Sequence, residues 1–211
     1  MNINNFLNQE MAIAFVCNQI KKSVDEDISK HNIASLILTG GNTVRPFLSL
    51  LSKTDIDWSK VWIILSDERW LPIDHDQSNE GQLKLLFLNN LTKKPNYMSL
   101  KTNHENPEDA IHELAKNLET VPQPFSCSLL SMGEDGHIAS LFPGRLWQEK
   151  IECSIFKEIK RISLSVKYFK ECQNNFILIR KSRQAILDTI SLPSNNKFYP
   201  LNYFQSEIVV F

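Results

Sequence analysis

Apolar residues along this chain form short continuous runs that alternate with segments of helical spacing. A compact apolar run is typical of a strand buried on both faces, whereas apolar positions three and four apart indicate one face of a helix. The runs predict strands at residues 34–38, 61–65, 128–130, 161–165, 176–179 and 207–211. The helical spacing predicts helices over residues 11–28, 44–51, 79–88, 110–118 and 181–190.

Strands and helices that alternate in this way favour a mostly parallel sheet covered by helices on both faces. Asn106 and Pro107 have the residue types of a helix cap and a first helical position, so they predict where the fourth helix begins. The 211 residues contain no internal repeat, low-complexity tract or linker, and we expect a single domain over residues 1–211. Such sheets bind ligands at the carboxyl ends of their strands.

Composition narrows the choice of partner and compartment. The formal net charge of −1 creates no field that would attract nucleic acid or an anionic membrane, so neither is expected as a partner. No apolar run approaches the ~18 residues of a membrane span, and the first residues lack the pattern of a signal peptide. The four cysteines are scattered, without metal-binding spacing. We therefore expect a cytoplasmic protein with reduced cysteines.

A histidine in a glycine-containing turn follows the predicted strand at 128–130. Gly133 and Gly136 allow backbone conformations that other residues avoid, and residues 138–142 are expected to begin a short helix. His137 would then lie at the carboxyl end of a strand, where α/β proteins hold their ligands. A histidine with a purely structural role fits the turn equally well when the turn is considered alone.

Two further loops follow predicted strands. Gly40 and Gly41 precede a helix, where successive amides and the Thr43 hydroxyl can face an anion. Asp67 and Arg69 follow the next strand, and an arginine can grip phosphate oxygens in a bidentate fork. A helix cap and a surface ion pair are the alternative interpretations of these loops. Their convergence with the histidine turn at one sheet edge favours a shared site.

Three segments together carry a resemblance to a known family: residues 38–43, residues 66–72 with Ser78 and Asn79, and residues 132–144. Their order and spacing resemble those of the family of 6-phosphogluconolactonases and glucosamine-6-phosphate deaminases over nearly the whole chain. The resemblance implies a three-layer, Rossmann-like α/β/α fold. It also implies a small-molecule sugar phosphate lactone as the partner of the protein.

Two of these segments separate the two activities. The deaminases carry an acidic residue in a sequence of the type Asp-Gly-His-Ile-Ala-Phe-Asn-Glu, whereas Ser-Leu-Phe-Pro stands at residues 140–143 here. Arg69 stands where the deaminases usually have an aromatic residue. The resemblance therefore implies hydrolysis of 6-phosphoglucono-δ-lactone to 6-phosphogluconate in the oxidative pentose phosphate pathway.

The chain departs from the family at the expected phosphate end. Asn42 replaces a serine that is usual in the first loop, and a late Gly-x-x-Lys corresponds to Arg180 and Arg183. Arg183 can supply a cation in place of the lysine, but a planar fork and a point charge are not interchangeable. Loss of the glycine at Arg180 would also restrict the backbone.

Lactone hydrolysis needs one base that deprotonates water, and imidazoles titrate near neutral pH. His137 is expected to be this base, and the amides of residues 133–137 are candidate donors to the oxyanion. Asp67 is the second candidate for the catalytic region, as a group that orients water or His137 or as a buried carboxylate that caps the following loop. Asp135 either holds the histidine tautomer or caps the turn.

The expected site thus combines the catalytic residues His137 and Asp67 with a substrate and phosphate site formed by Gly40, Gly41, Asn42, Thr43, Arg69 and Arg183. This scheme needs no metal and no cofactor. We expect a monomer or a small homo-oligomer. A glucosamine-6-phosphate deaminase/isomerase-like enzyme and a noncatalytic sugar-phosphate-binding protein are the alternative functions.

Overall fold

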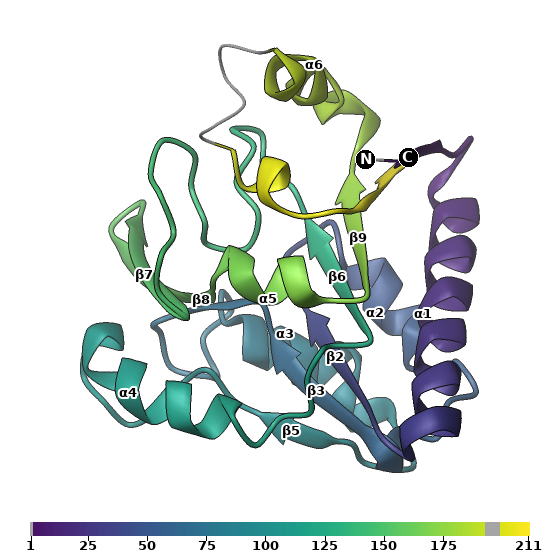
Figure 1. Cartoon of the computed structure of the whole chain (residues 1–211), viewed down its shortest axis with the longest axis horizontal. Helices are drawn as coiled ribbons and strands as arrows, with labels where there is room; N and C mark the ends of the chain where they lie inside the picture. Colours follow the sequence, from purple (N-terminus) through teal and green to yellow (C-terminus); the bar gives the residue numbers. More distant parts are fainter. Residues whose placement is uncertain (1, 193–198) are drawn as a thin grey trace.

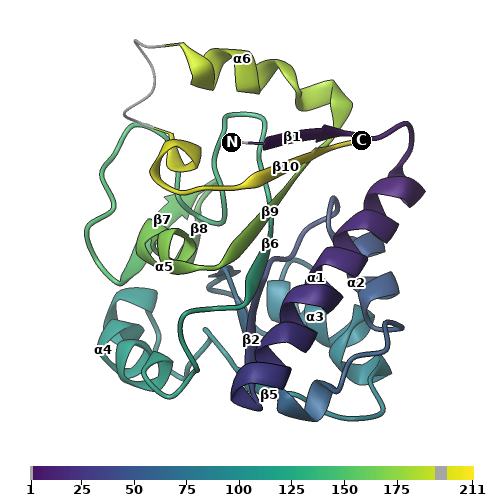
Figure 2. The same ribbon diagram turned by 45° about the vertical axis from the view of Figure 1, so that its right-hand side comes forward.

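A computed structural model describes residues 2–192 and 199–211. Seven parallel strands form a central sheet in the order β1-β10-β9-β6-β2-β3-β5 (Figure 1). These strands are β1 (Asn2–Asn5), β2 (Ala34–Leu38), β3 (Val61–Leu65), β5 (Asn96–Met98), β6 (Cys127–Ser131), β9 (Asn174–Ile179) and β10 (Glu207–Val210). The helices are α1 (Gln9–His31), α2 (Arg45–Leu51), α3 (Asn79–Leu86), α4 (Pro107–Leu118), α5 (Val166–Glu171) and α6 (Ala185–Ser191). Figure 2 shows α1, α2 and α3 on one side of the sheet and α4 and α5 on the other, which confirms the expected three-layer α/β/α fold.

The interior strands are those that the apolar runs predict. All five residues of β2 and four of the five residues of β3 are buried. Leu36 of β2 pairs with Ile63 of β3 on one side and with Cys127 of β6 on the other. The strands β1 and β5 lie at the two sheet edges. β1 is largely polar and β5 has only three residues, so no apolar run predicts either strand.

A second, antiparallel sheet holds β4 (Asp67–Arg69), β8 (Ile159–Leu164) and β7 (Ile151–Phe156). Residues 161–165 therefore form a strand as predicted, but that strand lies outside the parallel sheet. Lys157 and Glu158, with φ of 51° and 65°, form a tight turn that makes β8 return antiparallel to β7. The prediction that Asp67 to Arg69 form a loop is also wrong, because these residues pair with β8.

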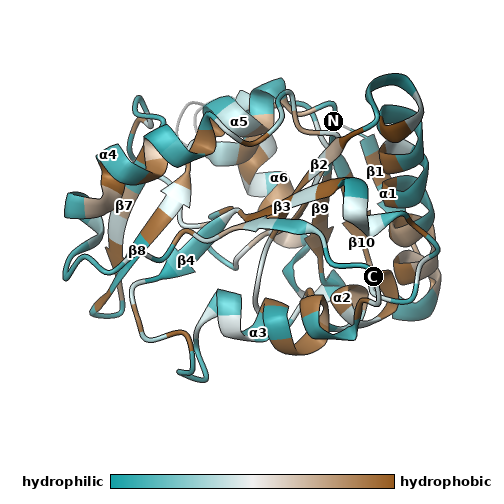
Figure 3. Cartoon of the chain, turned by 90° about the horizontal axis from the view of Figure 1, so that it is seen from below, coloured by the Kyte–Doolittle hydropathy of each residue, from teal (hydrophilic) through white to brown (hydrophobic). Residues whose placement is uncertain are grey.

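Five of these helices follow their predicted positions with changes at the ends, whereas α5 was not predicted. Asn8 caps α1 by accepting a hydrogen bond from the Met11 amide at 2.9 Å. Asn106 occupies the cap position of α4, but its side chain makes no capping bond and accepts one from the Lys160 Nζ at 2.6 Å. The predicted helix at 181–190 is split into a 3₁₀ turn and α6. Hydrophobic and hydrophilic residues alternate along α1 and α4, as Figure 3 shows.

The expected short helix at residues 138–142 is wrong. Ile138 instead forms isolated antiparallel bridges with Met132 and with Leu141. The Leu141 amide donates to the Ile138 carbonyl at 3.0 Å, and Ala139 has a left-handed φ of 54°. Pairing with Met132 returns the chain toward the end of β6, which is incompatible with a helix beginning at Ile138.

The cysteines agree with the expectation of reduced thiols. All four are free, and Cys17, Cys127 and Cys172 are buried. Burial raises the pKa of Cys17 to about 12, so its reactive thiolate form is suppressed at neutral pH. Within the described ranges, no helix is both long enough and apolar enough to cross a membrane.

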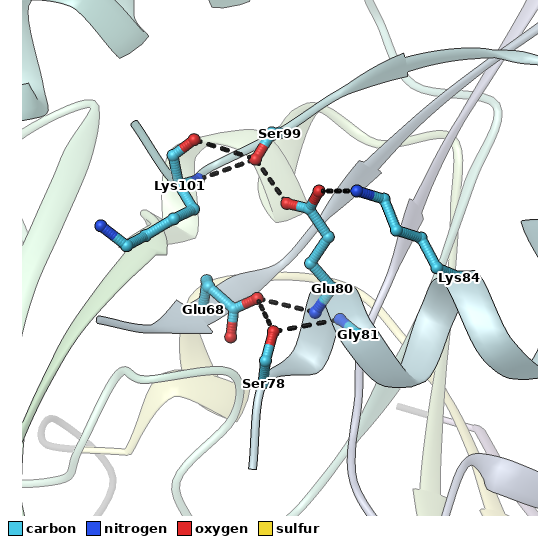
Figure 4. Close-up of polar contacts among 7 residues, drawn as sticks. All are labelled: Glu68, Ser78, Glu80, Gly81, Lys84, Ser99 and Lys101. Carbon is cyan, nitrogen blue, oxygen red and sulfur yellow. Dashed lines mark hydrogen bonds and ion pairs between the residues drawn. The ribbon is translucent and has the colours of Figure 1, made fainter. Parts of the chain in front are cut away.

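The carboxylate of Glu68 joins β4 to the start of α3. It accepts four hydrogen bonds, from the amides of Arg69, Asn79 and Glu80 and from the hydroxyl of Ser78, at 2.7, 2.8, 2.7 and 3.1 Å respectively. Figure 4 shows the bonds to Glu80 and Ser78. Glu68 is only 1% exposed, and burial raises its pKa to about 7 although the hydrogen bonds favour its charged form.

Replacement of Asn175 by alanine is expected to lower the free energy of unfolding by about 3 kcal/mol. The buried side chain donates to the carbonyls of Phe169 (2.8 Å) and Gln205 (2.9 Å) and accepts from the Ser128 hydroxyl (2.7 Å), so alanine removes three buried hydrogen bonds. Urea denaturation measures the loss. Asn174→Ala is the matched control, because that side chain is exposed and its loss should cost less than about 1 kcal/mol. Equal losses would contradict this account of Asn175.

The pH dependence of stability tests the sign of the Glu68 contribution. The folded-state pKa of about 7 lies above the ordinary 4.5, so between these values the folded protein holds a proton that the unfolded chain has lost. The contribution is therefore complete below the unfolded pKa and is lost as pH rises through about 7. Relative to Glu68→Gln, the free energy of unfolding of the wild type should fall by up to about 3 kcal/mol between about pH 5 and pH 8. Urea titrations across this range would contradict the account if the difference stayed constant or rose.

Candidate active site

Three loops meet at one edge of the molecule because β6, β2 and β3 are neighbours in the central sheet. They border a cavity of about 520 Å³. The cavity is lined by residues 39–43 and 131–135 and by Asp67, Arg69, Asn79, His137, Ala139, Phe156, Lys157, Arg161, Arg180 and Arg183. The structure thus brings together every residue predicted for the site: Gly40, Gly41, Asn42, Thr43, Asp67, Arg69, His137 and Arg183.

The first loop offers backbone donors to the cavity. Gly41 has a φ of 100°, a conformation that favours glycine, and the chain then enters α2. The Gly41 amide donates to the Gln82 side chain at 3.1 Å, so it is already paired. The amides of Asn42 and Thr43 have no hydrogen-bond partner among the residues that the structure describes. Two unpaired amides at adjacent positions suit the oxygens of an anion.

His137 and Asp135 form a hydrogen-bonded pair in the third loop. The His137 Nδ1 lies 2.5 Å from the Asp135 Oδ1, and the imidazole is 23% exposed. Burial alone would raise the pKa of Asp135, but the hydrogen bonds from His137 outweigh burial and hold that pKa below its usual value. An ionised carboxylate only accepts, so we assign the ring proton to Nδ1. The Nε2 lone pair, which has no partner in the described part of the chain, is then available to a ligand.

The backbone of the same turn is held mainly by its own hydrogen bonds. The Gly133 amide donates to the His137 carbonyl at 2.9 Å, and the Gly136 amide donates to the Gly133 carbonyl at 3.1 Å. The His137 amide donates to the Asp135 side chain at 3.1 Å, and the Asp135 amide interacts with its own carboxylate. Of the predicted oxyanion donors, this leaves the Glu134 amide. A Cβ at Gly133 would overlap the His137 ring, so the turn requires glycine there.

Asp67 connects the three loops. It is 3% exposed, and its carboxylate accepts four hydrogen bonds, from the side chains of Thr39 (3.4 Å), Ser66 (3.0 Å), Asn79 (3.4 Å) and Ser140 (2.6 Å). Thr39 begins the first loop, Asn79 begins α3, and Ser140 belongs to the third loop. These contacts are those of a buried carboxylate that holds loops together, and a direct role in orienting water stays a prediction.

One nitrogen of the Arg69 guanidinium is held by hydrogen bonds. Its Nη1 donates to the Asn79 Oδ1 at 2.5 Å and to the Gln77 carbonyl at 2.8 Å. Its Nε and Nη2 have no partner among the described residues and remain available for an anion. Asn79 in turn packs against Gly40, where a Cβ would overlap its side chain. The side-chain amide group of Asn79 therefore links the first loop to Arg69.

Two arginines reach the cavity from the chain that follows β9. The Arg183 Nη2 forms an ion pair with the Glu134 Oε1 at 3.1 Å. The Arg180 Nη2 lies 3.5 Å from the Asn42 carbonyl, to which it donates. Arg180 has a φ of −70° and a ψ of 143°, an extended conformation that any residue can adopt. The replacement of the family's glycine by Arg180 therefore causes no backbone strain here.

The second sheet contributes cavity residues that were not predicted from the sequence. Arg161 is 8% exposed, its guanidinium carbon lies 5.2 Å from the Phe156 ring centroid, and its Nε has no hydrogen-bond partner within residues 2–192 and 199–211. Phe156 stacks on Phe142 at 4.7 Å, and Phe142 lies 4.9 Å from the His137 ring. The rings of Phe142 and Phe156 form an apolar wall beside the histidine. No local pattern indicates that the β7–β8 hairpin lies against β4.

The lining of the cavity carries five Lys and Arg side chains against three carboxylates, which suits an anionic ligand. Buried and partly buried guanidiniums favour phosphate in particular, because the planar fork matches its oxygens. Over the described ranges, no group of three or more His, Cys, Asp or Glu side chains is arranged to hold a metal ion.

Comparison with known proteins identifies the family of the chain. A family model described as glucosamine-6-phosphate isomerases/6-phosphogluconolactonase matches residues 7–210. A curated 6-phosphogluconolactonase of Pseudomonas putida is 35% identical over 130 residues, which cover 62% of this chain and 53% of the relative. Another, of Neisseria meningitidis, is 30% identical over 185 residues, which cover 80% of this chain and 78% of the relative. The chain matches only about half of the length of several of these relatives.

Solved structures share the fold. The crystal structure of a 6-phosphogluconolactonase from Shewanella baltica superposes with a TM-score of 0.91 at 24% identity, covering all of this chain and 97% of that one. A monomeric glucosamine-6-phosphate deaminase superposes with a TM-score of 0.84 at 14% identity, covering all of this chain and 96% of that one. The fold is therefore common to both activities. Because the family model spans nearly the whole chain, the protein belongs to the glucosamine-6-phosphate isomerase/6-phosphogluconolactonase family.

Proposed function

We propose that the protein hydrolyses 6-phosphoglucono-δ-lactone to 6-phosphogluconate, as a step of the oxidative pentose phosphate pathway, with His137 as the general base. The observation that carries the proposal is the His137–Asp135 pair, which leaves the His137 Nε2 unpaired in a cation-rich cavity. The lactone as substrate is supported by the names of the curated relatives. A phosphorylated ligand is supported by the free amides and guanidiniums of the same cavity.

The reaction proceeds in two steps around one tetrahedral intermediate. The His137 Nε2 takes a proton from water while the water oxygen bonds to the lactone carbonyl carbon, whose former double bond becomes an oxyanion. The bond from that carbon to the ring oxygen then breaks, and His137 returns the proton to the departing oxygen. Asp135 keeps Nδ1 protonated and stabilises the imidazolium between the two steps. The Glu134 amide is our candidate donor to the oxyanion.

In this proposal the phosphate group lies at the end of the ligand opposite the lactone carbonyl. The amides of Asn42 and Thr43 offer two donors, and Arg69 offers an anchored guanidinium. Arg161 lies opposite Arg69 in the β4–β8 pairing, so its unpaired, buried charge adds to the same potential. Arg183 supplies a further cation once the phosphate competes with Glu134 for its guanidinium.

Two other functions remain to be separated by experiment. A deaminase of the type described above carries its acidic residue five positions after the histidine, where Phe142 stands here and stacks on Phe156. A noncatalytic sugar-phosphate-binding protein would use the arginines without the histidine. The preserved His137–Asp135 pair favours an enzyme over such a protein, because binding alone does not require an oriented imidazole.

His137→Ala is expected to lower the rate of lactone hydrolysis by about 100-fold or more, because the base is lost. The assay follows freshly generated 6-phosphoglucono-δ-lactone against its spontaneous hydrolysis, with glucosamine 6-phosphate tested in parallel. His104→Ala is the matched control, since His104 also pairs with a carboxylate, at 3.1 Å from Glu113, but does not line the cavity.

Lactone turnover that survives His137→Ala would refute the role of this histidine. Turnover of glucosamine 6-phosphate would instead favour the deaminase. Sugar-phosphate binding without acceleration of either reaction would favour the noncatalytic protein.

Arg69→Ala and Arg183→Ala are expected to raise the KM for the phosphorylated lactone about tenfold each, because each removes a charged hydrogen-bond donor to phosphate. Glucono-δ-lactone, which lacks the phosphate, provides the internal control and should be hydrolysed equally by the variants and the wild type. Steady-state kinetics with the two lactones measures the contrast. Equal losses on both lactones would show that the arginines do not act on the phosphate.

A further inference from the structure

Glu68 does not line the cavity, yet it holds the parts from which the Arg69 site is built. One of its oxygens accepts hydrogen bonds from the amides of both Arg69 and Asn79, at 2.7 and 2.8 Å. The side chains of these two residues meet in turn, with the Arg69 Nη1 donating to the Asn79 Oδ1 at 2.5 Å. The Glu68 carboxylate therefore fixes both ends of the contact that orients the guanidinium.

A neutral side chain cannot replace this carboxylate without loss. Each Glu68 oxygen accepts two hydrogen bonds, so all four donors require an acceptor on that side. Glutamine has one amide oxygen and one NH₂ group, and whichever way it turns, two donors face another donor. Because the site is buried, water cannot readily repair the mismatch.

We propose that Glu68 is a positioning residue for phosphate binding, whose carboxylate holds the Arg69 backbone and the first residue of α3 in register and so keeps the Arg69 guanidinium aimed at the cavity. This inference rests on the proposed function, in which Arg69 binds the substrate phosphate. It assigns to Glu68 an effect on substrate affinity that is exerted through Arg69 and Asn79.

The charged surroundings of Glu68 make this effect depend on pH. The groups that face it are Asp67 and Arg69 on β4, Glu80 on α3, Tyr97 on β5, Lys101 after β5 and Arg161 on β8. Burial raises the pKa of Glu68 to about 7, so its charge is lost as pH falls through the neutral range. Substrate affinity should therefore weaken as Glu68 becomes protonated.

Glu80 provides a matched control at the same end of α3. It is also a buried carboxylate, at 2% exposure, and it pairs with the Lys84 Nζ at 2.7 Å. Its carboxylate accepts a hydrogen bond from Ser99, as Figure 4 shows, and ties α3 to the chain after β5. The Glu80 carboxylate makes no hydrogen bond to Arg69 or Asn79. Its loss should disturb stability without disturbing the guanidinium.

Glu68→Gln is expected to raise the KM for 6-phosphoglucono-δ-lactone about tenfold at about pH 8, with kcat changed less than about twofold. Glu80→Gln should leave both constants within about twofold. At about pH 6 the wild-type Glu68 is itself mostly protonated, so the ratio of the two KM values, Glu68→Gln over wild type, should fall toward one. The substrate phosphate also titrates in this range, but it does so in both proteins and cancels in the ratio.

A KM ratio near one at both pH values, or equal effects of Glu68→Gln and Glu80→Gln, would overturn the proposal. A ratio that is raised equally at both pH values would also overturn it, because the charge would then play no part. If Glu68→Gln folds poorly, Ser78→Ala removes one of the four donors and should produce a smaller rise in KM with the same dependence on pH.

Calorimetric binding of 6-phosphogluconate separates this inference from the proposed function. A wild type that binds the sugar phosphate without hydrolysing the lactone would refute the function, and a weaker Kd in Glu68→Gln but not in Glu80→Gln would still support the positioning role. A wild type that hydrolyses the lactone, with equal Kd values in all three proteins, would leave the function standing and refute the role of Glu68.

Discussion

The buried carboxylate of Asp67 is the interaction on which the rest of the site depends. A carboxylate that is 3% exposed persists in a protein interior only when its oxygens are hydrogen-bonded, and its four donors come from separate parts of the chain. Satisfying Asp67 therefore requires the first loop, the start of α3 and the third loop to meet. The cavity lies where they meet, and His137 lies three residues before the Ser140 donor.

Successive residues of β4 hold different segments at this edge of the molecule. Side chains alternate between the two faces of a strand, so Asp67 and Glu68 point to opposite sides. Asp67 binds the loops of the central sheet, whereas Glu68 binds the amides at the start of α3. Arg69 follows them, with its backbone held by Glu68 and its guanidinium held by Asn79. A three-residue strand thus supplies two acids that hold neighbouring segments together and one cation that lines the cavity.

The second sheet explains why the cavity is both cationic and partly apolar. The β7–β8 hairpin brings Phe156, Lys157 and Arg161 to a cavity whose other residues follow the central strands. Phe142 and Phe156 shield the histidine, while Arg161 lies over their rings. Low exposure strengthens the attraction of such a guanidinium for an anion, because water screens the charge less. A sugar phosphate, with an apolar ring face and a charged end, matches a cavity that has an apolar part and a cationic part.

The sequence was sufficient to predict the layers of the fold and to predict that the candidate site residues lie together, because buried parallel strands appear as apolar runs and the loops at their carboxyl ends share one edge of the sheet. All the predicted site residues line one cavity. Long-range pairing could not be predicted in the same way. The polar edge strand at 2–5 and the three-residue edge strand at 96–98 contain no apolar run, and nothing local indicates that Arg161 pairs with Arg69 or that Ser140 binds Asp67. The helix expected at 138–142 does not form, again because of a pairing that the local sequence does not indicate: Ile138 is paired with Met132.

The most direct test of the central claim is a crystal structure of the protein with 6-phosphogluconate bound. We expect the phosphate against the amides of Asn42 and Thr43 and the guanidinium of Arg69. The ligand carboxylate, which derives from the lactone carbonyl, should then lie about 3 Å from the His137 Nε2. A phosphate bound beside His137, or a ligand bound outside this cavity, would contradict the account.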